Sequence, residues 1–66
     1  MQIDLNGKPR PIEGGTTISK LIEELGLANQ ACAVEVNKRL VRKARYPEHE
    51  LADGDHVEIV TLVGGG

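Results

Sequence analysis

Aromatic residues and cysteine are nearly missing from this sequence of 66 residues, which has no Trp, no Phe, one Tyr and one Cys. A single Cys excludes an internal disulfide framework and favours a reducing compartment. Without large rings, the hydrophobic core must be built from Ile, Leu, Val and Ala. A chain of this length buries only about 60% of the surface that its unfolded form exposes. The sequence therefore predicts one small domain, residues 1–66, without a deep substrate cavity.

The sequence also lacks a strong charge excess and a long apolar run. Eight Lys and Arg oppose ten Asp and Glu, which gives a formal net charge of −2. Proteins that bind nucleic acid or membrane surfaces use concentrated positive charge, so we expect neither partner. Asp4 lies where a signal peptide or membrane span would require apolar residues. These features predict a cytoplasmic protein that is a monomer when free.

The first residues predict a β-hairpin. Apolar and polar residues alternate there, the pattern of a strand with one buried face, which would carry three side chains: Met1, Ile3 and Leu5. Asn6-Gly7 follows and is a strong hairpin signal. The returning strand contains Pro9 and Pro11, which lack amide donors, so we expect it at a sheet edge with Ile12 as its buried residue.

Residues 17–25 carry a helical pattern. Four apolar residues at spacings of three and four form one stripe: Ile18, Leu21, Ile22 and Leu25. Thr16 or Thr17 can cap the first turn, and Gly26 can end the helix in a left-handed conformation. A helix this short is not stable alone in water, so its apolar stripe must pack against a sheet.

The second half of the chain predicts three more strands. Alternating residues indicate a strand at 31–36, and Asn37-Lys38-Arg39 forms its turn before the short return strand Leu40-Val41. Asp53-Gly54-Asp55 is a further turn. It leads into the longest predicted strand, residues 57–63.

Between these strands, residues 42–50 show no clear period and predict an irregular loop. Tyr46 or Leu51 would return from this loop to close the core. On the long strand, Val57 and Ile59 would occupy the buried face. The order of elements places the first and last strands parallel at the centre of one sheet.

This arrangement belongs to the α+β class and predicts a β-grasp, or ubiquitin-like, fold. We expect a mixed sheet of about five strands with one main helix packed on one face. An extended, flexible C-terminal tail, residues 63–66, would follow the last strand.

Three consecutive glycines end the sequence: Gly64, Gly65 and Gly66. Glycine has no side chain to bury and loses the most backbone freedom on ordering, so this run cannot serve a core. A tail without β-carbons is thin enough to enter a narrow crevice of another protein. There Gly66 would present its α-carboxylate as the reacting group. The alternative is a frayed end or a cloning remnant.

The strand before the glycines has an unusual outer face. Glu58 is followed on that face by Val60 and Leu62, where a solvated face should be polar. Two exposed apolar residues beside the tail indicate a docking patch for a partner. The predicted partner-binding set is Val60, Leu62, Val63, Gly64 and Gly65.

The whole chain resembles the ThiS family of sulfur carriers in thiamine biosynthesis. The resemblance rests on its length and on five segments: Met1-Gln2-Ile3, Thr17–Leu25, Asp53-Gly54-Asp55, Glu58-Ile59-Val60 and Val63-Gly64-Gly65-Gly66. The combination of length, Asp-Gly-Asp turn and triple-glycine end is its most specific part. The helix departs from a full capping box, because it lacks the expected Glu.

This resemblance implies a cycle of reactions at Gly66. A ThiF-like enzyme would adenylate its carboxylate, and a persulfide from a donor such as a cysteine desulfurase would convert it to a thiocarboxylate. The thiazole synthase ThiG would then receive the sulfur. The chain has no phosphate-binding loop and no clustered metal ligands. We therefore expect it to bind no cofactor, to leave ATP and Mg²⁺ to the activating enzyme, and to act as a cosubstrate rather than an enzyme.

Three other functions stay open. A carrier of the molybdopterin synthase type would use the same chemistry with another acceptor. A β-grasp interaction module would carry no chemistry at all. Conjugation to lysines, as by ubiquitin-like modifiers, would give adducts of higher mass.

Cysteine and basic residues offer alternative sites. Cys32 is interpreted as a small core residue rather than a reactive thiol, because no basic, Cys or His neighbour in sequence activates it. Five basic residues form one concentrated run: Lys38, Arg39, Arg42, Lys43 and Arg45. A solvated loop is the favoured interpretation, with partner docking as a hypothesis, because aromatic residues for base stacking are missing.

Acidic residues and histidines do not form a recognisable site. The spacing of His49 and His56 matches no metal template, so both are interpreted as surface residues. Asp53 and Asp55 are interpreted as turn formers rather than as paired catalytic carboxylates.

Overall fold

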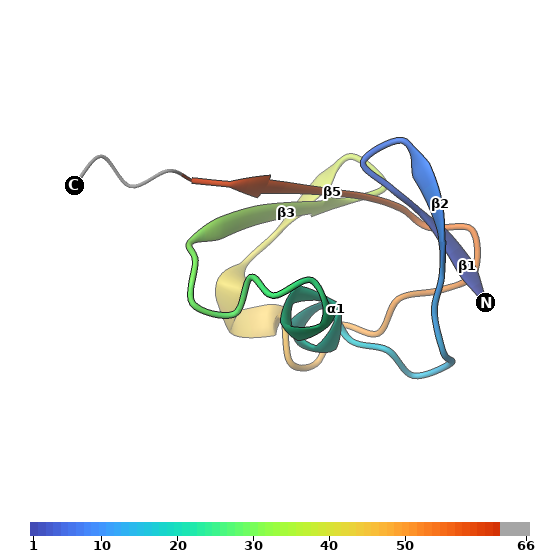
Figure 1. Cartoon of the computed structure of the whole chain (residues 1–66), viewed down its shortest axis with the longest axis horizontal. Helices are drawn as coiled ribbons and strands as arrows, with labels where there is room; N and C mark the ends of the chain where they lie inside the picture. Colours follow the sequence, from blue (N-terminus) through green and yellow to red (C-terminus); the bar gives the residue numbers. More distant parts are fainter. Residues whose placement is uncertain (63–66) are drawn as a thin grey trace.

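The fold is a five-stranded mixed sheet with one α-helix packed on one of its faces, in a computed structural model that describes residues 1–62 (Figure 1). The elements are β1 (Gln2–Leu5), β2 (Lys8–Pro11), α1 (Ile18–Glu24), β3 (Cys32–Val36), β4 (Arg39–Val41), the 3₁₀ helix η1 (Lys43–Arg45) and β5 (His56–Thr61). The strand order is β2-β1-β5-β3-β4, and β1 and β5 run parallel at the centre. The predicted β-grasp arrangement is confirmed; the tail predicted at residues 63–66 lies outside the described residues.

The hairpin of β1 and β2 forms as its turn residues predict. Asn6 and Gly7 both have positive φ, 51° and 85°. These values suit a turn whose twist matches the two strands. β2 is an edge strand, which accommodates its two prolines. Ile12 is buried, as predicted, one residue beyond the end of β2.

Local signals also define the helix. The side chain of Thr17 accepts a hydrogen bond from the Lys20 amide at 3.1 Å, so Thr17 is the N-cap. Thr16 is buried instead, and its hydroxyl donates to the Glu13 carbonyl at 2.7 Å. Gly26 has a φ of +74° just beyond the helix, as predicted. Of the four stripe residues, three are buried and Leu25 is half-buried against the core.

The core lies between α1 and the sheet and is almost entirely aliphatic. Its buried members are Ile3, Ile12, Ile18, Leu21, Ile22, Val34, Val36, Tyr46, Leu51, Val57 and Ile59. Tyr46 and Leu51 both close it, where the sequence left the choice open. Met1 was wrongly predicted to share the buried face of β1. Its side chain is 48% exposed, and only its carbonyl takes part in the sheet, as acceptor for the Ile12 amide at 2.7 Å.

Several elements differ from the sequence predictions, and β3, predicted from residue 31, begins at Cys32. The segment 42–50 contains the short helix η1, because repeated i to i+3 bonds form without any apolar period to signal them. β4 begins at Arg39, since Asn37 and Lys38 alone form the turn, with φ values of 52° and 69°. β5 begins at His56 and ends at Thr61, although the Leu62 amide still donates to the Ala31 carbonyl at 2.8 Å.

Across residues 1–62, no helix has the length and apolar character needed to span a membrane.

Candidate functional site

The site is built on β5, the strand from which the predicted reactive tail continues. β5 is the central strand, paired with β1 on one side and β3 on the other. Its C-terminal end points away from the body and from the N-terminus (Figure 1). Leu62 is the last described residue. β1 pairs with β5 only at His56 and Val57, whereas β3 pairs with it from Val57 to Thr61, so the C-terminal half of β5 is held mainly by β3.

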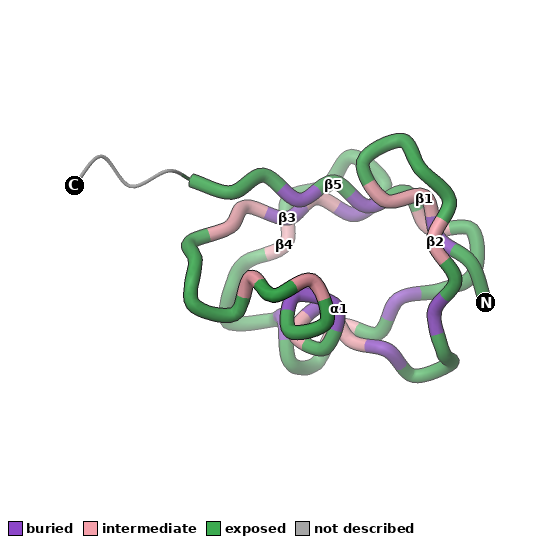
Figure 2. Tube along the Cα trace, viewed as in Figure 1, coloured by how far each residue is buried: buried purple, intermediate pink, exposed green. Residues whose placement is uncertain are grey.

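Side chains on β5 alternate between the core and the other face of the sheet. Val57 and Ile59 are buried under α1, whereas Val60 is 57% exposed and Leu62 55% exposed. Figure 2 shows this alternation of buried and exposed residues along the strand. The structure therefore confirms the predicted exposure of both apolar side chains. The sheet register shows which other side chains share the face of Val60 and Leu62.

The register extends this apolar surface onto β3 and β4. Ala33 lies opposite Val60, and Leu40 lies opposite Glu35. Directly paired residues of antiparallel strands share a face. Leu40 is 69% exposed, more than any other large apolar residue of the described part. We define the open face, opposite α1, by six residues: Ala33, Glu35, Leu40, Glu58, Val60 and Leu62.

Sequence reasoning identified the β5 part of the open face and missed the rest. Leu40 was recognised as part of a short strand, but its face was not assigned. Once the turn is known to be Asn37-Lys38, pairing places Leu40 beside Glu35, so a correct turn length would have revealed it. The other predicted site residues are Val63, Gly64, Gly65 and Gly66, which lie outside the described residues.

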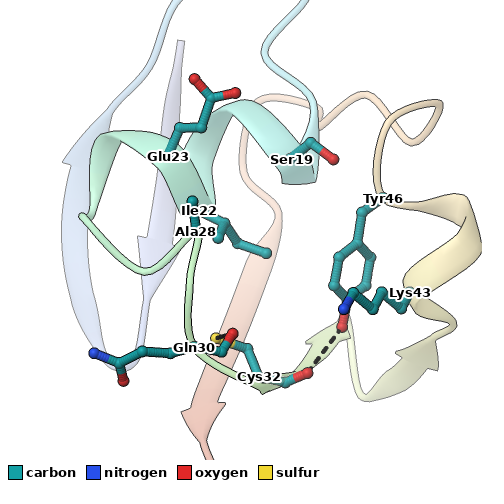
Figure 3. Close-up of a pocket in the computed structure, with 8 residues that line it drawn as sticks. All are labelled: Ser19, Ile22, Glu23, Ala28, Gln30, Cys32, Lys43 and Tyr46. Atoms are coloured by element: carbon teal, nitrogen blue, oxygen red, sulfur yellow. Dashed lines mark hydrogen bonds between the residues drawn. The ribbon is translucent and has the colours of Figure 1, made fainter.

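Cys32 lies on the opposite side of the sheet from the open face. It is half-buried, and its Sγ donates a weak hydrogen bond to the Gln30 carbonyl at 3.5 Å. It lines a hollow of about 230 Å³ beside α1, which Figure 3 shows together with Tyr46 and Lys43. The Tyr46 hydroxyl donates to the Cys32 carbonyl at 3.3 Å. Burial raises the pKa of Tyr46 above its ordinary value. Cys32 was predicted to be a small core residue. It packs against the core but is only half-buried, so this prediction is confirmed in part.

The acidic turn before β5 is structural, as predicted. The Asp53 carboxylate accepts from the Gln2 amide at 2.7 Å, and that of Asp55 accepts from the Ala52 amide at 2.8 Å. These bonds tie the turn to itself and to β1. General acid or base chemistry would need carboxylates free to exchange protons with a substrate.

Histidines and basic residues are dispersed. His56 lies 3.7 Å from the Asp4 carboxylate. In the part of the chain from residue 1 to 62, no three His, Cys, Asp or Glu side chains are grouped to hold a metal ion. The basic run is exposed throughout, and Arg45 pairs with Glu48 at 3.3 Å.

Comparisons of the sequence and of the fold with known proteins point to the same family. The model of the ThiS family matches residues 3–66. The sulfur carrier protein ThiS of Thermus thermophilus is 42% identical over 62 residues, covering 94% of this chain and 95% of that protein. A thiazole synthase of Magnetococcus marinus is 42% identical over all 66 residues, but the chain spans only 20% of its length. The crystal structure of ThiS from Geobacter metallireducens superposes with a TM-score of 0.82 at 29% identity, with both chains fully covered.

Proposed function

Because the chain belongs to the ThiS family, we propose that it carries sulfur as a thiocarboxylate on Gly66. The observation that supports this most strongly is the family match itself, which runs to the last residue and so includes the glycines. The fold adds a paired strand, β5, which ends at Thr61, shortly before them. In this proposal the folded domain, residues 1–62, is held by the partner enzymes, and the reacting atoms belong to Gly66.

The chemistry requires an activation step. A carboxylate is a poor electrophile, so a ThiF-like partner transfers AMP from ATP to the Gly66 carboxylate and releases pyrophosphate. A persulfide sulfur then attacks the carbonyl carbon and displaces AMP, which forms an acyl disulfide. A second thiol then attacks the sulfur atom that belongs to the persulfide donor, which forms a new disulfide with the donor and releases the thiocarboxylate. ATP and Mg²⁺ belong to the activating enzyme, and a cysteine desulfurase is the proposed source of the persulfide.

Thiazole synthase is the proposed acceptor of the sulfur. One curated thiazole synthase contains a segment that matches the full length of this chain. Two domains joined in one polypeptide in one organism commonly act together when they are separate in another. The carrier is then a cosubstrate of the activating enzyme and of the synthase, not a catalyst.

Intact-protein mass spectrometry tests the proposal. The full chain is incubated with ATP, Mg²⁺, the ThiF-like enzyme of the same genome and a persulfide donor. We expect the mass to increase by the replacement of one oxygen atom with one sulfur atom. A chain lacking Gly66 is the matched control and should show no increase, because its carboxylate is one residue short of the active centre. An unchanged mass for the full chain would refute the proposal.

A further inference from the structure

Two carboxylates face each other on the open face of the sheet. Glu35 on β3 and Glu58 on β5 are direct partners in the antiparallel register. Paired residues of this kind have Cβ atoms about 4.5–5.5 Å apart on the same face. Glu58 is exposed and Glu35 is half-buried. The two acidic side chains therefore start from neighbouring positions on the same face.

The described part of the chain supplies no cation to this pair. The ion pairs found among residues 1–62 join Arg10 to Glu24, Arg45 to Glu48 and His56 to Asp4. Like charges directly opposite each other destabilise a sheet. Repulsion between the two carboxylates therefore lowers the stability of the free protein, and a complex in which a cation reaches both carboxylates would remove it.

Apolar side chains flank the acidic pair on two sides. Leu40 extends the same cross-strand row, since it lies opposite Glu35. Val60 and Ala33 form the row two residues further along β5, toward Leu62. Neighbouring contacts that exclude water on binding strengthen an ionic contact between two proteins. Arginine suits such a position, because its planar group has five donors and can bond two carboxylates at once.

We propose that Glu35 and Glu58 together bind one arginine side chain of the thiazole synthase, beside an apolar contact made by Leu40, Val60 and Leu62. This inference rests on the proposed function, which makes that enzyme a partner. The apolar residues supply contact area, and the acidic pair selects a partner surface with a correctly placed cation. Docking through this surface would hold the C-terminal half of β5 against the synthase.

Calorimetric titration of the full chain with the thiazole synthase of the same genome tests the inference. For Glu58→Gln we expect Kd to rise about tenfold or more, because the partner cation loses a charged bond. The slope of log Kd against log salt should become shallower. The melting temperature of the free variant should rise by a few degrees, on the order of 1–5 °C, because the repulsion is gone. Glu35→Gln should act in the same directions.

Glu23→Gln is the matched control, since it makes the same charge change on α1, across the core from the open face. Its Kd should equal that of the unaltered chain. Val60→Asp tests the apolar contact separately, because it removes an apolar side chain and leaves both carboxylates of the pair in place. If Val60→Asp weakens binding while both Gln variants bind equally or more tightly, the acidic pair is no recognition element and the inference is overturned.

Two other results would also overturn it. Unchanged affinity for Val60→Asp and Glu58→Gln alike would show that the synthase does not dock on the open face. Weakened binding of Glu58→Gln to the activating enzyme, but not to the synthase, would assign the contact to the other partner. Failure of the mass experiment is distinct, because it refutes the sulfur chemistry whatever these affinities are.

Discussion

Tyr46 is the one Phe, Trp or Tyr side chain of the sequence, and it is the only ring in a core otherwise built from Ile, Leu and Val in the described residues. It is buried, and its hydroxyl reaches across to the Cys32 carbonyl at the start of β3. The ring therefore packs in the core while the hydroxyl ties the segment after η1 to the sheet. The sequence predicted the burial of this ring as one of two options, but not the hydrogen bond, whose partner is 14 residues away.

Tyr46→Phe tests this role through pH. Near neutrality the variant should lose about 1 kcal/mol of unfolding free energy with the hydrogen bond. Burial raises the pKa of Tyr46 in the folded state above 10.0, so the unfolded chain loses this proton first as pH rises. The unaltered protein therefore loses this stabilisation as pH rises through that range, while the variant does not.

Urea unfolding at about pH 8 and about pH 11, on either side of the ordinary tyrosine pKa, measures the effect. The difference in unfolding free energy between the two proteins should shrink at the higher pH. Comparing the two proteins cancels the titration of lysines, which they share. A difference that stays constant would show that the ionised hydroxyl is tolerated in the fold.

The hairpin turn of β1 and β2 does more than reverse the chain. The Asn6 side chain donates to the Ile59 carbonyl at 3.2 Å and accepts from the Ile59 amide at 2.9 Å. The parallel ladder of β1 and β5 has only two paired positions, at Asp4 and Leu5. Asn6 thus continues this ladder with its side chain. Asn37, in the other turn, similarly accepts from the His56 amide at 2.9 Å, so both turns hold β5 in place.

Asn6→Gly should cost about 1–2 kcal/mol of unfolding free energy, because the backbone groups of Ile59 lose their partners. Glycine keeps the positive φ, so the turn itself stays unstrained. Lys38→Gly is the control, at another positive φ of 69°. It should change stability by less than about 0.5 kcal/mol or raise it. Chemical denaturation measures both, and equal effects at the two positions would mean that the side-chain bonds of Asn6 contribute nothing.

At the scale of the whole molecule, the fold separates two surfaces. The open face lies on one side of the sheet, and α1 covers the other, as the burial pattern along β5 shows (Figure 2). The basic run begins at the turn after β3 and continues through β4 and η1. Most of its charges are thus at the sheet edge and in the segment beyond, away from the centre of the open face.

Reversing the charges at Arg42 and Lys43 to Glu should leave the affinity for the activating enzyme unchanged at low salt, where electrostatic contributions are largest. Both side chains are exposed, so unfolding free energy should change by less than about 0.5 kcal/mol. A binding titration checks the affinity, and thermal unfolding verifies the fold. A drop in affinity of about fivefold or more would assign the basic run to partner docking, since steering by surface charge then matters.

Local signals were sufficient for most of the architecture. Asn6-Gly7, the stripe from Ile18 and the cap at Gly26 each depend on neighbouring residues, and all appear in the structure. Errors arose where a nonlocal contact decides. Met1 continues the alternation of β1, but its side chain is exposed because the strand begins one residue later at the rim of the sheet.

The amino-acid sequence alone determined the five strands, α1, their order and the glycine-rich end, because turn, cap and periodicity signals act within a few residues. It could not determine which side chains meet across strands. Leu40 joins the open face, and Glu35 lies opposite Glu58, only through the pairing of β3 with both neighbours. Backbone hydrogen bonds between residues distant in the chain set that register, so the composition of the docking surface was decided by the tertiary structure.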